Sequence, residues 1–229
     1  MIQANPAAAV RRPKASRPKL SVPDSDGLRR VMEAARGTLW EIPVLMSATT
    51  ALRRSEVLGL RWSDVDLEVG KVRAVQGLQR VRDPDGHSEL AFLDLKSERA
   101  RREIVLLPLV VRALREQRRR QAERRLASGD AWIDVDLVCD RGDGGAPDPD
   151  AFTHAFKRIA KAANVSPATR LHDLRHGVAT ALLAQGVHPA IVSALLGHSS
   201  PGFTMGTYQH MLDGMTVEAA KALERALGL

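Results

Sequence analysis

Residues 170–212 read RLHDLRHGVATALLAQGVHPAIVSALLGHSSPGFTMGTYQHML. Apolar side chains in the first part recur at helical spacing, and Gly186 supplies a stop, which predicts a helix starting at Leu171. Proline is favoured in the first turn of a helix and glycine just past its end. A second helix is therefore predicted from Pro189 to Leu196, ending before Gly197. The apolar positions of the first helix are Leu174, Val178, Ala181 and Leu182.

Four polar side chains of this stretch are candidates for chemistry. His172 and Arg175 stand three residues apart, and residues at that spacing share one face of a helix. They can therefore point at one target, which is predicted to be an anion because a planar guanidinium matches the oxygens of a phosphate. His198 lies in the turn after Gly197, and Tyr208 is the only tyrosine of the chain.

The segments HDLRH, LLGHSS and TYQH resemble the C-terminal boxes of the tyrosine recombinase (phage integrase) family. Upstream, residues 51–62, ALRRSEVLGLRW, are similar to the first arginine box of that family. Residues 95–97, LKS, ahead of residues 101–106, RREIVL, resemble its lysine hairpin. The boxes occur together and in family order from about residue 51 to the end, which makes the resemblance specific. Ala51 stands where the family usually has glycine, a departure that concerns only the local turn.

The resemblance implies the tyrosine recombinase catalytic-domain fold, mainly α with a small antiparallel β-sheet. It also implies the role of each site residue. Tyr208 is the expected nucleophile, and a phenol with a pKa near ~10 needs cationic help to attack a phosphodiester. The residues expected to neutralise or hydrogen-bond the phosphate oxygens are Arg53, Arg175 and His198. His172 is expected to assist proton transfer at Tyr208, and Lys96 to protonate the departing 5′-oxygen.

The residues themselves leave alternatives open at several of these positions. Arg53 can simply pair with Glu56, which is otherwise expected to orient Arg53. Lys96 is the only lysine between Lys71 and Lys157, and lysine, unlike arginine, can lose its proton; the alternative is an ordinary exposed lysine. His176 lies one position past Arg175, hence on another face of the helix, and is expected to be structural.

Composition and charge set the outer limits. The 229 residues are 44% hydrophobic, enough for one main core. The chain carries a net charge of +7, but residues 1–22 hold five basic side chains and no acidic one, so the other residues carry 29 basic side chains against 27 acidic. This arm is expected to contact DNA phosphates, with a solvated linker as the alternative. Its basic residues are Arg11, Arg12, Lys14, Arg17 and Lys19.

Residues 1–24 are interpreted as a basic interdomain linker and residues 25–229 as the catalytic domain. In the family, such a linker follows an N-terminal core-binding domain, which is expected to be absent from this chain. Without a run of 18 apolar residues or an apolar signal core, the protein is expected to be soluble, cytoplasmic and nucleoid-associated on DNA. A single cysteine, Cys139, excludes an internal disulfide and a cysteine-built zinc site.

Further elements are predicted from periodicity and turn residues. Ser25 or Asp26 is expected to cap a helix beginning near Gly27, and further helices are expected over residues 39–48, 108–127 and 151–163. Residues 72–75, 88–95 and 103–106 are predicted as strands of one small sheet, the last two joined by a turn containing Ser97, and residues 137–139 as another strand. The aspartates of residues 134–150 do not match a calcium loop, so no metal site and no cofactor are predicted.

The leading hypothesis is a site-specific DNA recombinase of a bacterial mobile genetic element. It cleaves and rejoins strands through a 3′-phosphotyrosyl intermediate without metal or ATP. Expected partners are double-stranded DNA attachment sites, three further copies of the chain in a homotetramer on DNA, and accessory DNA-bending or directionality factors; no membrane partner is expected, and the free protein is expected to be a monomer. A helix over residues 217–227 is expected to dock on a neighbouring copy or on its own domain.

Two alternatives belong to other classes. A type IB topoisomerase-like enzyme shares the tyrosine chemistry and relaxes DNA without exchanging partners. A non-catalytic helix-turn-helix DNA-binding module accounts for residues 179–197, but it leaves Arg53, Lys96 and Tyr208 without a role.

Overall fold

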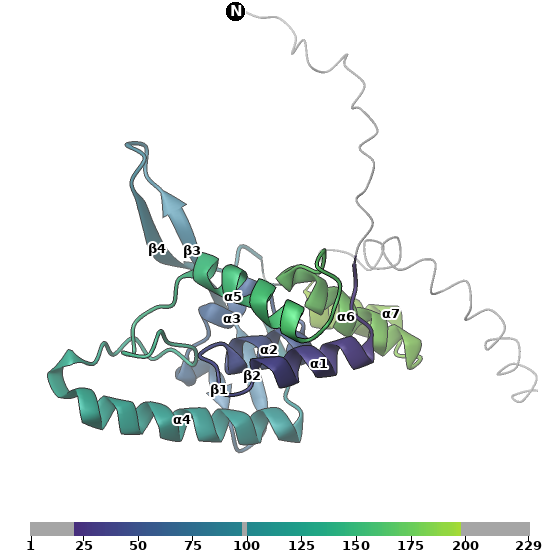
Figure 1. The fold of residues 1–229 in the computed structure, drawn as a ribbon, viewed down its shortest axis with the longest axis horizontal. Helices are drawn as coiled ribbons and strands as arrows, with labels where there is room; N and C mark the ends of the chain where they lie inside the picture. Colours follow the sequence, from purple (N-terminus) through teal and green to yellow (C-terminus); the bar gives the residue numbers. More distant parts are fainter. Residues whose placement is uncertain (1–20, 98–99, 198–229) are drawn as a thin grey trace, which may run out of the picture.

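A computed structural model describes residues 21–97 and 100–197, and it shows a helical body with two small antiparallel sheets (Figure 1). The predicted class, mainly α with antiparallel β-structure, is confirmed. The helices are α1 (Ser25–Ala35), α2 (Glu41–Thr50), α3 (Arg54–Leu58), α4 (Pro108–Ser128), α5 (Pro149–Ala162), α6 (Leu171–Ala184) and α7 (Pro189–Leu196), with 3-10 turns η2 (Trp62–Asp64) and η3 (Gly129–Ala131).

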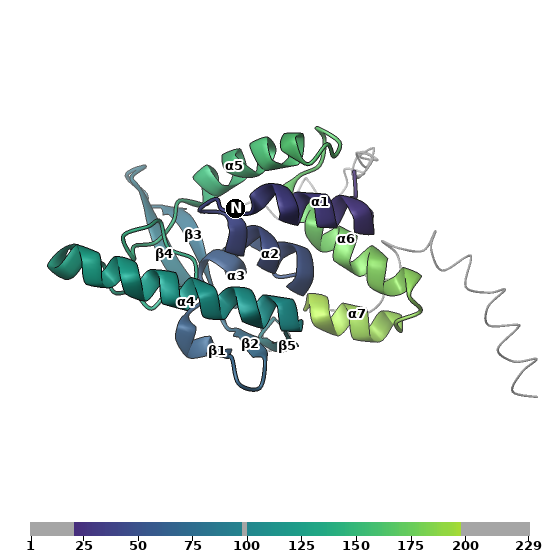
Figure 2. The ribbon, with the colours of Figure 1, turned by 60° about the horizontal axis from the view of Figure 1, so that its bottom comes forward.

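Helix α2 lies at the centre of the body. Its residues from Ile42 to Ala48 are all buried, as expected for a helix that is apolar on every side. It packs against α1, α4 and α6, and Figure 2 shows it surrounded by these helices. Helix α5 packs against α1. Its buried Phe152 stacks on Trp40, which directly precedes α2, with ring centroids 5.0 Å apart.

The helix ends follow local capping rules. Helix α6 begins at Leu171 and α7 spans the predicted Pro189–Leu196, after which Gly197 adopts a left-handed conformation with φ of 60°. The predicted cap of the first helix is wrong by one residue. Asp24 caps α1, since its side chain accepts a hydrogen bond from the Gly27 nitrogen at 2.7 Å. The extended backbone of Asp24 allows that bond, whereas Ser25 and Asp26 are already helical.

The strands form two sheets, where the sequence predicted one. The first has the order β1–β2–β5, and the second is the hairpin β3–β4, which projects away from the body in Figure 1. Val72 of β2 is opposite Ile104 of β5, and Leu78 of β3 is opposite Phe92 of β4. The strands are β1 (Val65–Asp66), β2 (Lys71–Ala74), β3 (Gln76–Arg82), β4 (Ser88–Asp94) and β5 (Arg102–Val105).

Two strand predictions are therefore corrected. The strands predicted at 88–95 and 103–106 belong to different sheets, because each has another partner, and the segment containing Ser97 connects the sheets. The partner of β4 is β3, which the sequence did not reveal because glycine and polar residues interrupt its apolar pattern. Residues 137–139 are not a strand; a single bridge joins Leu137 to Arg61.

Across the described parts of the chain, no helix is long and apolar enough to span a lipid bilayer.

Candidate active site

The start of α3 holds one arginine and its buried partner. Arg53 precedes the helix, and Glu56 is in its first turn with only 1% of its side chain exposed. One carboxylate oxygen of Glu56 accepts from the Arg53 guanidinium at 2.7 Å, and the other accepts from the Arg53 backbone nitrogen at 2.9 Å. The predicted pairing of Arg53 with Glu56 is thus present, and it fixes the guanidinium relative to its own helix.

Glu56 remains a carboxylate despite its burial. Burial alone raises its pKa, but the hydrogen bond and positive charge of Arg102, followed by the bonds from Arg53, outweigh it and hold the pKa of Glu56 below its usual value. The Arg102 guanidinium lies 2.9 Å from Glu56. Glu56 therefore carries a full negative charge between two arginines.

The second predicted arginine, Arg175, is buried in the middle of α6. It is only 3% exposed, and its guanidinium donates to the backbone carbonyls of Ala51 and Leu196. Arg53 reaches the same end of α7, with its guanidinium 3.5 Å from the Gly197 carbonyl. The structure thus brings Arg53 and Arg175 to one place, where the turn before α3 meets α6 and the end of α7.

Ala51, which stands where the family usually has glycine, ends α2 in a left-handed conformation. Its φ of 54° and ψ of 22° are left-handed, a conformation that glycine adopts without steric cost and alanine adopts less readily. Its carbonyl is one of the two that Arg175 contacts. The substitution is therefore compatible with the turn.

His172 lies on the exposed face of α6, one turn from His176. Their rings meet edge to face with centroids 5.0 Å apart, so His176 neighbours a predicted site residue, although it was expected on another face from Arg175. Although part of the His172 side chain is exposed, the protein atoms around its ring desolvate it, and this partial burial, then the charges of His176 and Arg175, lower the pKa of His172 below 6.5. A neutral imidazole at neutral pH can accept a proton.

A basic cavity of about 510 Å³ opens beside these residues. Among the described residues no carboxylate lines it, but two of its arginines pair with carboxylates outside the lining: Arg80 with Asp148 at 3.0 Å, and Arg170 with the fully buried Asp173 at 3.1 Å. A guanidinium group has five N–H donors, so each pair orients its arginine and leaves donors for an anionic ligand. The charged or basic residues that line it are Arg53, Arg54, Arg80, Arg170 and His172.

The predicted lysine follows the end of β4. Lys96 is exposed and lies in the segment that connects β4 with β5. Sequence reasoning missed Arg102, which contacts both Glu56 and the carbonyl of Ala100 in the segment that carries Lys96. A signal for it exists: alternation along β5 places Arg102 on the same face as the buried Ile104.

Several predicted residues lie outside the described part of the chain. They include the expected nucleophile Tyr208, with His198, and the basic arm of Arg11, Arg12, Lys14, Arg17 and Lys19.

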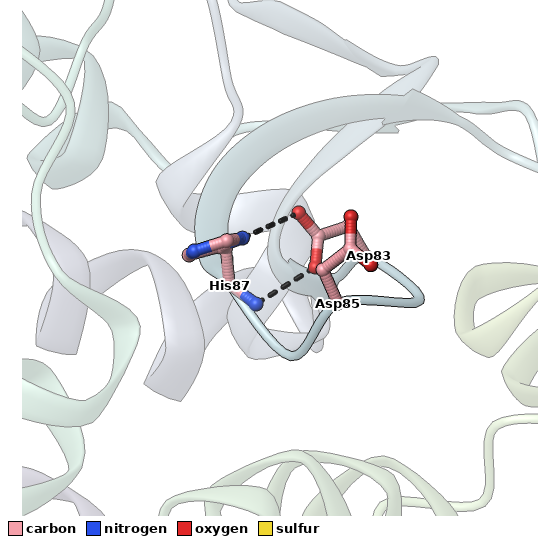
Figure 3. A group of neighbouring side chains, drawn as sticks. All are labelled: Asp83, Asp85 and His87. Carbon is pink, nitrogen blue, oxygen red and sulfur yellow. Dashed lines mark hydrogen bonds and ion pairs between the residues drawn. The ribbon is translucent and has the colours of Figure 1, made fainter.

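An exposed group at the tip of the β3–β4 hairpin has the composition of a metal site. Atoms of Asp83, Asp85 and His87 that could bind a metal lie within 4.8 Å of one another (Figure 3). Asp83 accepts from the His87 backbone nitrogen at 2.7 Å and lies 3.2 Å from its ring nitrogen. These contacts close the hairpin turn. In the aspartate-rich segment, Asp140 and Asp143 pair with Arg124 and Arg141.

Comparison with known proteins gives one consistent result. The model of the phage integrase family matches residues 25–215. The chain is 29% identical over 203 residues to a tyrosine recombinase XerC-like protein of Caldanaerobacter subterraneus subsp. tengcongensis, covering 86% of this chain and 52% of that protein. It is 28% identical over 184 residues to an integrase of Streptomyces ambofaciens, covering 80% and 47%. The chain thus spans about half the length of these curated relatives.

Solved structures share the fold. The XerA recombinase superposes with a TM-score of 0.65 at 22% identity, covering 91% of this chain and 66% of that one. The Tn1549 transposon integrase in complex with transposon right end DNA gives a TM-score of 0.70 at 20% identity, covering 93% and 68%.

Proposed function

This chain belongs to the phage integrase family, and from that membership we propose that residues 25–229 are the catalytic domain of a site-specific DNA recombinase. Residues 1–24 are then a basic arm that contacts DNA phosphates. The proposed substrate is double-stranded DNA. The supporting relatives include the Tn1549 integrase, solved with transposon DNA, and a lambda integrase dimer, solved on a core site.

The observation that carries this proposal is the meeting of Arg53 and Arg175 at the end of α7. Their guanidinium groups contact the adjacent carbonyls of Gly197 and Leu196, although 122 positions separate the two arginines in the sequence. Two cations at one point suit a phosphodiester, whose negative charge otherwise repels an attacking anion. His198 directly follows Gly197 in the sequence and is the proposed donor of a further hydrogen bond.

In the proposed reaction the Tyr208 oxygen attacks the scissile phosphorus while His172 accepts the phenolic proton. Arg53, Arg175 and His198 stabilise the charge on the non-bridging oxygens of the pentacoordinate transition state. The bond to the 5′-oxygen breaks, and Lys96 donates a proton to that oxygen. The product is a 3′-phosphotyrosyl link, which a 5′-hydroxyl from another strand attacks to rejoin the DNA and release Tyr208.

Strand exchange requires two DNA sites and therefore several active sites together. We infer a homotetramer on DNA, assembled from free monomers, with residues 217–227 as the segment that docks between copies. DNA-bending or directionality factors are the expected accessory proteins. The protein acts in the cytoplasm and on the nucleoid.

The decisive experiment uses Tyr208→Phe on a nicked suicide substrate made from the ends of the element that encodes the chain. The wild type is expected to form a covalent adduct on a denaturing gel, and the variant none, with DNA affinity nearly unchanged because the hydroxyl contributes little else. An adduct that persists in Tyr208→Phe would refute the assignment.

Two further substrates separate the alternatives. Exchange between paired attachment sites supports a recombinase. Relaxation of supercoiled DNA without exchange supports a topoisomerase-like enzyme, and binding without cleavage supports a helix-turn-helix module.

A further inference from the structure

Arg102 is buried, and each nitrogen of its guanidinium group has a hydrogen-bond partner. Its side chain is 7% exposed. Nη2 lies 2.9 Å from Oε2 of Glu56, Nε donates to the Leu195 carbonyl at 2.6 Å, and Nη1 donates to the Ala100 carbonyl at 2.9 Å. All three guanidinium nitrogens are therefore engaged by groups from three different segments.

Two arginines, Arg53 and Arg102, pair with the single carboxylate of Glu56, and the sum of their charges matters for the reaction. Arg53 paired with Glu56 alone would be a neutral unit, and a neutral unit stabilises developing negative charge poorly. With Arg102 as a second partner of Glu56, the three side chains carry one net positive charge. Arg102 is buried and Arg53 is 38% exposed, so that charge is presented at Arg53.

The two carbonyl contacts place Arg102 between the other parts of the site. Ala100 belongs to the segment that begins with Lys96, and Leu195 lies at the end of α7. Gly197, whose carbonyl contacts Arg53, follows two residues later. A single guanidinium thus fixes Glu56 of α3, the segment of Lys96 and the end of α7 relative to one another.

We propose that Arg102 is a positioning residue for phosphate cleavage: it offsets the charge of Glu56, so that Glu56 holds Arg53 in place without cancelling its positive charge. This proposal rests on the proposed function, since it assigns Arg102 a task in the same reaction. Arg102 touches no reacting atom and acts through Glu56 and Arg53.

The first test measures charge and does not depend on DNA. In protein labelled with ¹³C at glutamate carboxyl groups, the pKa of Glu56 is followed by NMR in the wild type, Arg102→Gln and Arg102→Lys. The pKa is expected to rise in Arg102→Gln and to rise less in Arg102→Lys, which keeps the charge. Arg73→Gln on the adjacent strand β2 is the matched control and should leave Glu56 unchanged. A Glu56 that titrates alike in all four proteins would overturn the proposal.

The second test measures single-turnover cleavage of the suicide substrate. Arg102→Gln is expected to be slower than the wild type by roughly 10²-fold, similar to the loss of one transition-state donor, with DNA affinity little changed. In Arg102→Gln, protonation of Glu56 at low pH removes the negative charge that otherwise cancels the positive charge of Arg53. The ratio of wild-type to variant rates should therefore shrink as pH falls, whereas a purely structural role would leave that ratio independent of pH.

The double variant Arg102→Gln/Glu56→Gln removes the uncompensated charge directly. Its cleavage rate should exceed that of Arg102→Gln, and its deficit should no longer depend on pH. Because Glu56 also positions Arg53, Glu56→Gln alone is measured beside it. A double variant whose deficit is the product of the two single-variant deficits would mean that Arg102 does not act through Glu56, and it would overturn the proposal. If the wild type itself forms no adduct, the proposed function fails, and the titration of Glu56 still decides whether Arg102 sets its charge.

Discussion

His172 provides a test at the scale of one side chain. Its pKa in the folded protein is lowered below 6.5, first by burial and then by the nearby positive charges. If neutral His172 accepts the Tyr208 proton, the cleavage rate should stay high as pH falls to 6.5. It should be lost only as pH falls through the lowered pKa. The measurement is the single-turnover cleavage rate between pH 5 and 8 (about the range in which histidine titrates).

The control for this pH dependence is His172→Asn. It is expected to slow cleavage at pH 7 by roughly 10²-fold or more, the usual contribution of a positioned proton acceptor, and to lose the acid limb. An acid limb that survives in His172→Asn would assign it to another group, with neighbouring His176 the first to examine. The same depressed pKa implies that the unfolded chain binds more protons, so the free energy of unfolding should fall as pH drops below 6.5.

The parts of the site that the sequence could predict are those with a local signature. Arg53 and Glu56 stand three residues apart at a helix start, and Arg175 stands at helical spacing from His172. Arg102 has no such signature. Its role depends on the pairing of β5 with β2 and on the packing of α7 against β5, which are long-range contacts that spacing does not encode.

At the scale of elements, the same distinction separates correct from wrong predictions. The bounds of α6 and α7 follow from periodicity, proline and glycine, all of which are local. The partners of β4 and β5 are set by tertiary packing. Strand β3 lies against α3 so closely that a Cβ added at Gly77 would be 3.1 Å from the Ser55 side chain.

Gly59 at the end of α3 tests how closely that helix must approach β3. A Cβ at Gly59 would lie 2.6 Å from the Leu78 nitrogen and 2.9 Å from backbone atoms of Gly77, where nothing flexible can move aside. Gly59→Ala is expected to lower the free energy of unfolding by about 2–3 kcal/mol, as overpacking does, and to slow cleavage because α3 carries Glu56. Urea denaturation and the suicide substrate measure both effects.

Gly37→Ala is the control for this substitution. Its φ of +70° makes alanine unfavourable, by about 1 kcal/mol, but no atom lies within 4 Å of the added Cβ. Gly37 lies before α2, away from α3, so this variant should lose stability and keep its cleavage rate at temperatures where it is folded. Equal cleavage rates in the two variants would show that the contact of α3 with β3 does not position the site.

At the scale of the whole molecule, the net charge of +7 lies mostly in the arm. Beyond residues 1–22 the chain has nearly balanced charge, and the exposed arginines of α4 are interleaved with glutamates. Arg119, for example, pairs with both Glu116 and Glu123, and Arg115 pairs with Glu68. Paired cations release fewer counterions on binding, so the location of the charge matters more than its sum.

The last prediction tests whether DNA binding depends on where the positive charge lies or on the net charge of the chain. Each phosphate neutralised on B-DNA contributes about 0.9 to the slope of log affinity against log salt. Changing all five basic residues of the arm to glutamine should lower the magnitude of that slope by up to about 4.5. The matched control changes five exposed arginines of α4 to glutamine, an equal change in net charge, and should leave the slope nearly unaltered. Fluorescence anisotropy with labelled duplex over a salt series measures both. Equal changes in the two variants would mean that net charge alone governs binding and that the arm is only a linker. The arm residues are Arg11, Arg12, Lys14, Arg17 and Lys19, and the control residues are Arg112, Arg115, Arg118, Arg119 and Arg125.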